Sequence, residues 1–150
     1  MDKENMASQQ NYEIGTPGKP WRNEEKASWL SQQTIKRSYQ QQVVTKVEAI
    51  GQDLSDLLIV EQYGALSYDP DTYTLWVVKT KNWQDGKPTV FITGGVHGYE
   101  TSGVQGALRF VETTLTSYVD SYNFIVAPCI SPWGYETINR WNPNAIDPNR

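Results

Sequence analysis

The 150-residue chain contains very little of the two side chains that most often bind metals or serve nucleophilic catalysis. It has one cysteine, Cys129, and one histidine, His97. A single cysteine excludes an internal disulfide and a cysteine-rich metal cluster. A zinc site with two histidines cannot be built from this chain alone, and a Ser-His-Asp site would have to use His97.

Long apolar runs and an excess of positive charge are also missing. No stretch approaches the roughly 18 apolar residues of a membrane span. Thirteen Lys and Arg against seventeen Asp and Glu give a net charge of −4, which excludes a strongly basic nucleic-acid surface. No apolar segment follows residues 1–4, so we expect no signal peptide, and the single free cysteine then favours a cytoplasmic protein.

The first 30 residues are polar and interrupted by glycine and proline. Up to residue 37 the branched aliphatic side chains are only Ile14, Leu30 and Ile35. Such a composition predicts a flexible leader, with Trp21 and Trp29 as the side chains able to pin it to the body. We expect the folded part to comprise residues 31–150.

Hydrophobic periodicity in the remainder predicts an α/β fold. Apolar residues at helical spacing predict helices over 38–54 and 102–118, and β-branched and aromatic runs predict strands over 57–63, 72–78, 89–93 and 122–127. The run 89–93 is almost entirely apolar, as expected for a central strand covered on both faces. The order strand, glycine turn, helix, strand predicts a parallel pair. After Pro128 the periodicity ends and the chain becomes rich in Pro, Asn and Trp.

The segment 94–101 carries two candidate metal ligands. It follows a buried strand and precedes a helix, which is where ligand sites in α/β sheets occur. His97 and Glu100 are three residues apart, so in a tight loop both can face one point, and both residue types bind zinc. A His-x-x-Glu spacing is common by chance. A surface histidine and a glutamate that stabilises a helix N-terminus are therefore the alternative.

A second polar segment, residues 140–150, contains Arg140 and Arg150 at its two ends. Arginine binds carboxylates through two parallel hydrogen bonds, so this segment suits an anionic end of a substrate. The alternative is a solvated polar loop. Between the two segments, Cys129 follows an apolar strand and is expected to be buried and inert. The chain has no nucleophile elbow, phosphate-binding loop or dinucleotide-binding turn.

In their order and spacing, these segments resemble the zinc carboxypeptidase family of the carboxypeptidase A/B type, also called funnelins. The family pattern is H-x-x-E after an apolar strand, an N-P-D-G-like turn, an arginine, and G-V-D-x-N-R. The corresponding residues are His97 to Glu100, Ser131 to Glu136, Arg140, and Ala145 to Arg150. The resemblance covers residues from about 34 to 150. It implies a mixed, largely parallel sheet flanked by helices.

The resemblance also implies an activity, a cofactor and a substrate. The protein would be a zinc metallocarboxypeptidase that releases C-terminal residues from peptides with a free terminal carboxylate. His97 and Glu100 resemble two of the three protein ligands of zinc. Arg140 resembles the arginine that polarises the scissile carbonyl. Asn149 and Arg150 resemble the pair that binds the terminal carboxylate. Neither nucleic acid nor membrane is an expected partner.

The chain departs from the family pattern at several positions. Ser131 and Trp133 stand where the turn usually has Asn and Asp, and Ala145 stands where a Gly is usual. The family's third zinc ligand, its substrate-capping tyrosine and its general-base glutamate would lie beyond Arg150. We therefore expect residues 31–150 to be the N-terminal half of a catalytic domain that needs its C-terminal half.

Two other functions stay open at this point. A deacylase of the succinylglutamate desuccinylase and aspartoacylase group shares H-G-x-E and D-x-N-R, which residues 97–100 and 147–150 match. The turn at residues 134–136 favours the peptidases instead. The third possibility is an inactive fragment or binding module, which would have no tight zinc site and no turnover.

Overall fold

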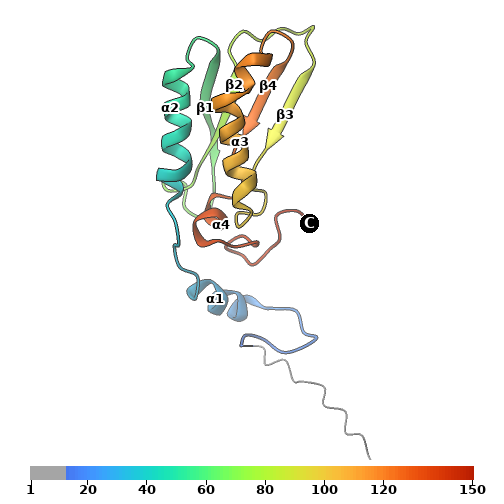
Figure 1. The fold of residues 1–150 in the computed structure, drawn as a ribbon. Coiled ribbons are helices and arrows are strands. Elements are labelled where there is room, and N and C mark those ends of the chain that lie inside the picture. Colours follow the sequence, from blue (N-terminus) through green and yellow to red (C-terminus); the bar gives the residue numbers. More distant parts are fainter. Residues whose placement is uncertain (1–12) are drawn as a thin grey trace, which may run out of the picture. The chain divides into compact units, whose positions relative to one another are not determined.

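The structure is a computed structural model that describes residues 13–150 (Figure 1). The chain divides into two compact units, residues 1–33 and residues 34–150. The prediction of a flexible leader falls partly on residues 1–12, which lie outside the described residues, and the leader's flexibility stays a prediction. The first unit contains helix α1 (Asn23–Ser31), which the sequence periodicity did not predict. None of its side chains is buried, and its first turn is capped by a hydrogen bond from the Arg22 amide to the Glu25 carboxylate (2.8 Å).

The second unit contains a four-stranded sheet. Its strands are β1 (Leu58–Ala65), β2 (Thr74–Thr80), β3 (Thr89–Thr93) and β4 (Asn123–Ala127). Their order in the sheet is β1-β2-β4-β3. The β1–β2 and β2–β4 pairs are antiparallel, and β3 and β4 are parallel. The mixed sheet and the parallel βαβ pair are confirmed, although parallel pairing is a smaller share of this sheet than expected.

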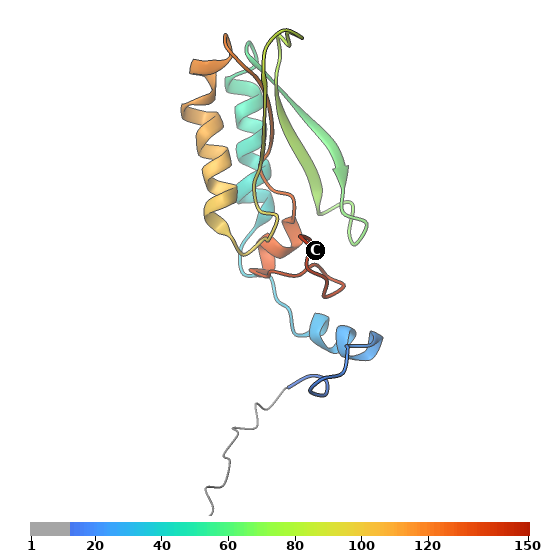
Figure 2. The ribbon, with the colours of Figure 1, turned by 90° about the vertical axis from the view of Figure 1, so that its right-hand side faces the viewer.

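Helices α2 (Thr45–Asp53) and α3 (Thr101–Thr113) cover one face of the sheet (Figure 2). Val60 of β1 lies against Gly51 of α2, and the rings of Phe110 in α3 and Phe124 in β4 are 5.9 Å apart. The helix predicted over residues 102–118 is confirmed as α3 and the turn after it, and the apolar residues at helical spacing are buried in this layer: Val104, Leu108, Val111 and Leu115.

The strand at residues 89–93 occurs where the sequence predicts it, but its position in the sheet differs. Among the described residues β3 is an edge strand, and its exposed and half-buried residues alternate. Phe91 is 66% exposed. The expectation of a central strand covered on both faces is therefore wrong for this part of the chain. β4, with four of its five residues buried, occupies the central place, because sheet order is set by the crossover and not by the apolar content of one strand.

The irregular elements differ most from the sequence prediction. The helix predicted at 38–54 begins with a π-helical turn, η1 (Gln40–Val44), which leads into α2. Just before this turn, the Ser38 hydroxyl accepts a hydrogen bond from the Gln41 amide (3.1 Å). The helix predicted at 102–118 ends in a 3₁₀ turn, η2 (Leu115–Tyr118). Helix α4 (Pro132–Thr137) forms where the sequence shows no helical period and a turn was expected, and all six of its residues are buried.

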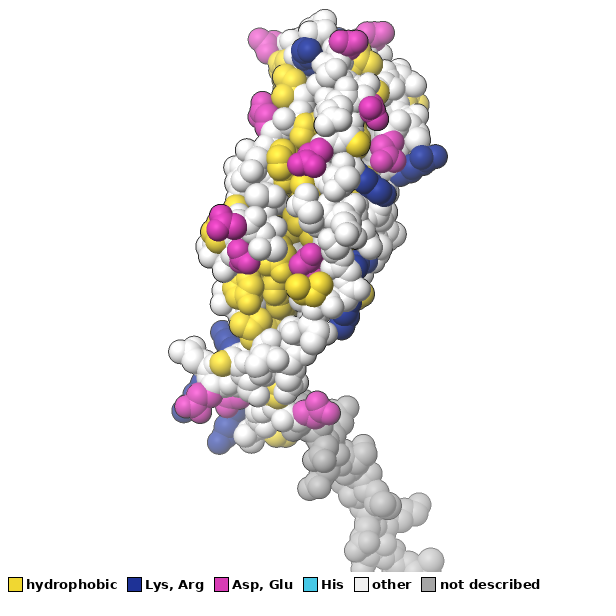
Figure 3. Space-filling view, turned by 90° about the vertical axis from the view of Figure 1, so that its left-hand side faces the viewer, with side chains coloured by type: hydrophobic (Ala, Val, Ile, Leu, Met, Phe, Trp, Pro, Cys, Tyr) yellow, Lys and Arg dark blue, Asp and Glu magenta, His cyan; other side chains and the backbone are white. Residues whose placement is uncertain are grey.

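The surface around α2 mixes apolar and charged side chains. Figure 3 shows apolar side chains gathered in patches along this face of the second unit, between scattered carboxylates and basic groups. Within residues 13–150, no helix has both the length and the apolar character needed to cross a membrane. Cys129 is buried as predicted, and burial raises the pKa of its thiol to about 12.

Candidate active site

The candidate site is built on the loop that connects β3 to α3. Gly94 continues the parallel ladder beyond β3, since its amide donates to the Ala127 carbonyl and its carbonyl accepts from the Ile130 amide. The chain then turns at Gly95, whose φ of 61° is unfavourable for residues with a Cβ. Residues 96–100 therefore leave the ladder at the carboxyl ends of the parallel strands β3 and β4. This is the expected place for a ligand site in an α/β sheet.

The loop rests directly on α4, with backbone against backbone. A Cβ at Gly98 would overlap the Gly134 carbonyl carbon and the Tyr135 nitrogen, so only glycine fits at position 98. The Tyr99 amide donates to the Asn139 carbonyl (3.0 Å). The Ser131 hydroxyl donates to the Val96 carbonyl (2.6 Å). Helix α4, which the sequence pattern did not predict, is therefore the platform that fixes the loop carrying His97 and Glu100.

His97 lies between two carboxylates. Its Nδ1 is 3.0 Å from Oε1 of Glu100, and its Nε2 is 2.8 Å from Oδ1 of Asp147. The residue is only 6% exposed. Hydrogen bonds to Asp147 first, and to Glu100 second, raise the pKa of the imidazole. The structure thus brings the two residues of the H-x-x-E spacing together as predicted.

Asp147 connects His97 to the second polar segment. Its Oδ2 accepts a hydrogen bond from Nε of Arg140 (3.0 Å) and lies 3.6 Å from Nε of Arg150. Its Oδ1 also accepts from the Asn149 amide (3.0 Å). The Asn149 amide first, and the His97 imidazole second, lower the pKa of Asp147 to about 2. Asp147 is a site residue that was not predicted from the sequence, although it belongs to the D-x-N-R pattern, which was the signal available.

The two arginines differ in exposure. The side chain of Arg140 is 33% exposed, and its Nη1 also donates to the Tyr99 hydroxyl (3.2 Å). The side chain of Arg150 is 81% exposed, and Asn149 is exposed as well. Arg140 therefore lies within the cluster around His97, whereas Asn149 and Arg150 lie at its solvent side.

Ala145 occupies a tight turn in the same segment. Its φ is 57°, a left-handed conformation in which a side chain costs roughly 1–2 kcal/mol. The Asn142 side chain holds the turn by accepting hydrogen bonds from the amides of Asn144 (2.9 Å) and Ile146 (3.0 Å). The glycine that the family pattern has at this position would adopt the turn without that cost. Alanine in place of glycine at position 145 thus adds strain to the turn, but the turn itself is retained.

His97 and Glu100 offer a nitrogen and an oxygen donor of the types that zinc binds. Nδ1 of His97 and Oε1 of Glu100 lie 3.0 Å apart, so both donors face one point and would hold one ion together. Asp147 on the opposite ring nitrogen matches the carboxylate partner that metal-bound histidines usually have. Within residues 13–150, no group of three or more His, Cys, Asp and Glu side chains is arranged to hold a metal. The residues present therefore fit part of a zinc site, with two donors and one supporting carboxylate.

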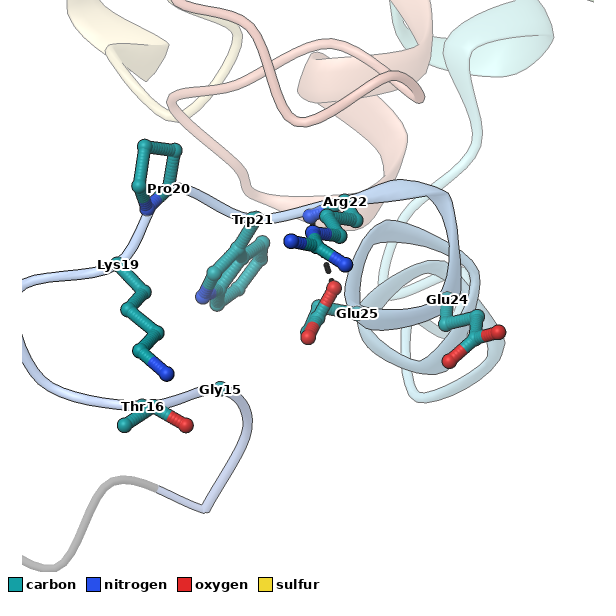
Figure 4. Close-up of a pocket in the computed structure, with 8 residues that line it drawn as sticks. All are labelled: Gly15, Thr16, Lys19, Pro20, Trp21, Arg22, Glu24 and Glu25. Atoms are coloured by element: carbon teal, nitrogen blue, oxygen red, sulfur yellow. Dashed lines mark hydrogen bonds between the residues drawn. The ribbon is translucent and has the colours of Figure 1, made fainter.

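A separate hollow of about 500 Å³ lies within the first unit (Figure 4). Trp21 stands at this hollow, where a Cβ at Gly15 would be 2.7 Å from its Nε1. The charged side chains around it include the Arg22–Glu25 capping pair. Its lining residues contain neither histidine nor cysteine: Gly15, Thr16, Lys19, Pro20, Trp21, Arg22, Glu24 and Glu25. This hollow has none of the features of the His97 cluster.

Solved structures that share this fold include proteins named as metallopeptidases and carboxypeptidases. A candidate metallopeptidase from Shewanella amazonensis SB2B superposes with a TM-score of 0.65 at 23% identity, over 79% of this chain and 46% of that one. Bovine thrombin-activatable fibrinolysis inhibitor, in complex with tick carboxypeptidase inhibitor, superposes with a TM-score of 0.57 at 20% identity. The match covers 76% of this chain and 38% of that one. Carboxypeptidase A from Helicoverpa armigera superposes with a TM-score of 0.58 at 19% identity. The match covers 73% of this chain and 29% of that one. The fold is thus that of the metallocarboxypeptidases, and the chain spans less than half the length of these relatives.

The sequence itself fits the same class. A model of the zinc carboxypeptidase family matches residues 43–150. The matched range includes the H-x-x-E loop, α4 and the segment with both arginines. The chain belongs to the zinc carboxypeptidase family.

Proposed function

We propose that this chain forms the zinc-binding and carboxylate-binding part of a metallocarboxypeptidase that releases C-terminal residues from peptides. The observation that carries the proposal is the position of His97, with Nδ1 on the Glu100 carboxylate and Nε2 on Asp147. Two donors of the correct type converge there, and a third group orients the ring. Family membership supports the same conclusion.

In this proposal each side chain has a separate task. His97 and Glu100 hold the zinc ion. Asp147 orients the imidazole by accepting from Nε2 and, through its other oxygen, orients the Arg140 guanidinium. Arg140 donates to the carbonyl oxygen of the scissile bond, where negative charge develops. When bound, zinc supplies Lewis acidity and lowers the pKa of water.

The exposed end of the cluster binds the substrate's terminus. The Arg150 side chain is 81% exposed while its Nε lies 3.6 Å from the Asp147 carboxylate, and Asn149 is adjacent to it. A guanidinium and an amide can together donate several directed hydrogen bonds to one carboxylate. A peptide with a free C-terminal carboxylate is the ligand that this pair fits.

Metal binding tests the first part of the proposal. We expect the 150-residue chain to bind zinc in a chelator competition experiment. His97→Ala and Glu100→Gln should weaken the affinity by more than the roughly 10- to 100-fold that loss of a supporting group costs. Glu48→Gln, at an exposed position of α2, is the matched control and should have no effect. Equal affinity in the wild-type chain and in His97→Ala would contradict the proposed site.

Peptide binding tests the second part. A short peptide with a free C-terminal carboxylate should bind the zinc-loaded chain more tightly than the same peptide with a C-terminal amide. Arg150→Gln should remove this difference, whereas Arg109→Gln, whose side chain is 74% exposed on α3, should preserve it. Preference for an N-acyl amino acid over the peptide would instead support the deacylase alternative. Absence of binding to zinc and to both ligands would support the inactive fragment.

A further inference from the structure

Arg37 connects the loop that carries His97 and Glu100 to α4. Its Nη2 donates to the Gly98 carbonyl (2.9 Å), and its Nη1 donates to the Thr101 hydroxyl (2.5 Å). Its Nε donates to the Tyr135 carbonyl (2.5 Å). Gly98 and Thr101 lie on either side of Glu100, whereas Tyr135 belongs to α4. One side chain therefore ties both ends of the Glu100 turn to the platform beneath the loop.

The shape of guanidinium is essential to this arrangement. The central carbon of the Arg37 guanidinium lies 3.5 Å from the centroid of the Tyr135 ring, so the group stacks on the ring while its edges donate three hydrogen bonds. Lysine has a compact ammonium group and cannot reproduce a planar fork that stacks and donates in three directions. The contacts thus require arginine rather than positive charge alone.

The backbone around Arg37 is fixed independently of its side chain. The amides of Lys36 (2.9 Å) and Arg37 (3.2 Å) both donate to the Glu136 carbonyl. The Tyr39 amide donates to the buried Glu136 carboxylate (2.7 Å). Arg37 consequently projects from a segment already bound to α4, so little conformational freedom is lost when the guanidinium makes its contacts.

We propose that Arg37 is a positioning residue that sets the place of the His97 imidazole and the Glu100 carboxylate by holding their loop on α4. This inference rests on the proposed function of that loop. Arg37 lies before residues 43–150, the range that the family model matches. It acts through the Gly98 carbonyl and the Thr101 hydroxyl, and its guanidinium hydrogen bonds go to these groups and to the Tyr135 carbonyl.

The single histidine of the chain allows a direct test. In the metal-free 150-residue chain, the ¹H and ¹⁵N resonances of the imidazole can belong only to His97. Arg37→Gln and Arg37→Lys should both shift these resonances, since neither side chain reaches all three acceptors. Arg109→Gln, which removes an exposed arginine from α3, should leave them unchanged. Unchanged imidazole resonances in both Arg37 variants would overturn the inference.

Zinc affinity provides a second readout with a chemical rescue. Arg37→Ala should raise the zinc Kd by roughly 10-fold, as expected for loss of a group that supports metal ligands. Millimolar guanidinium ion should restore part of the affinity and of the imidazole resonance in Arg37→Ala, but not in Thr101→Val. Rescue would not occur if the substitution merely loosened the fold. A wild-type chain without zinc affinity would overturn the proposed function, and the imidazole resonances would still decide the role of Arg37.

Thr101→Val keeps the inference testable if the Arg37 variants do not fold. This substitution removes one acceptor of the guanidinium and preserves the shape of the side chain. It should shift the His97 resonances in the same direction as Arg37→Lys, by a smaller amount. Identical resonances in Thr101→Val and in the wild-type chain would contradict the proposed linkage between Arg37 and the imidazole.

Discussion

The carboxylate of Asp147 is shared by groups that come from two distant parts of the chain. It accepts from Arg140 and from the Asn149 amide in its own segment, and it contacts His97, which is 50 residues earlier. When Nε2 of His97 donates to Asp147, Nδ1 is the nitrogen that remains for a metal on the side of Glu100. Asp147 thereby determines which ring nitrogen is available, although it is not itself a proposed ligand.

Replacement of Asp147 by asparagine should weaken zinc binding without unfolding the chain. An amide can still accept one hydrogen bond, but it loses the charge that favours an imidazole donor and the Arg140 guanidinium. We expect the zinc Kd to rise roughly 10- to 100-fold, measured by chelator competition. Asp56→Asn, at an exposed position, is the control. If both variants bound zinc equally well, Asp147 would have no role in orienting His97.

Cys129 should be unreactive in the native protein. Only the thiolate reacts with alkylating or disulfide reagents, and burial raises the pKa of this thiol to about 12. At pH 8 roughly one thiol in 10⁴ would then be ionised, and the 2% exposed side chain also excludes the reagent. Labelling with an aromatic disulfide should be slow in buffer and fast in denaturant. Rapid labelling of the native chain would show that residues around Cys129 open easily.

At the scale of elements, the site depends on the contact between the His97 loop and α4. The close approach of Gly98 to Gly134 and Tyr135 leaves no room for a side chain. The loop and the helix therefore form one assembly, in which the position of His97 depends on α4 as well as on β3. The same contact makes Gly98 a sensitive test position.

Gly98→Ala and Gly106→Ala should change stability in opposite directions. At Gly98 the added methyl overlaps backbone atoms of α4, which cannot move as a flexible side chain could. We expect a loss of about 2 kcal/mol or more in the free energy of unfolding. At Gly106, within α3, an added methyl meets nothing within 4 Å. Because alanine has the higher helix propensity, Gly106→Ala should raise the free energy of unfolding by about 0.5–1 kcal/mol. Urea unfolding measures both. A neutral Gly98→Ala variant would mean that the loop can lift from α4.

The sequence allows elements with a clear hydrophobic period to be predicted, but it does not allow their arrangement in the sheet to be predicted. The strand at residues 89–93 and the stripe from Val104 to Leu115 follow from local apolar patterns, and both occur as predicted. The edge position of β3 does not follow from local patterns, because the order β1-β2-β4-β3 depends on how chain crossovers close. Helix α4 was missed because its six residues are too few to display a helical period, although Pro132 at its start is a known helix-opening signal.

For the site, short-range spacing was predictive and long-range contacts were not. The H-x-x-E spacing correctly brings His97 and Glu100 together, since three residues in a turn leave few alternatives. The contacts of Asp147 with His97 and of Arg37 with Gly98 span 50 and 61 residues. Such contacts depend on the tertiary fold, which no local pattern specifies.

At the scale of the whole molecule, buried ionisable groups should make stability fall at alkaline pH. Burial, followed by the proximity of Cys129, raises the pKa of Tyr39. Burial, followed by the charge of Glu136, raises the pKa of Tyr73. These groups and Cys129 keep their protons in the folded state, whereas in the unfolded state they ionise from about pH 8.5 for Cys and about pH 10 for Tyr. The stabilisation is thus complete below about pH 8.5 and is lost as the pH rises.

We expect the free energy of unfolding to decline steadily between about pH 9 and pH 11. Tyr39→Phe should make the decline less steep, because it removes one group that must stay protonated. Urea unfolding at several pH values, with phenolate absorbance recorded in parallel, measures the effect. If all nine tyrosines ionised before any loss of native circular dichroism, the buried phenols would not oppose unfolding.

The central position of β4 affects how the molecule fluctuates. β4 is hydrogen-bonded to β2 on one side and to β3 on the other, whereas β1 and β3 are edge strands among the described residues. Amide hydrogen exchange should therefore be slowest in β4 and faster at the outer strands, which can fray without it. The residues just after β4 continue this ladder through the bonds from Ile130 to Gly94 and from Ser131 to Gly95. The loop that carries His97 is thus attached to the longest-lived part of the sheet, and it should stay assembled through many opening and closing events at the edges.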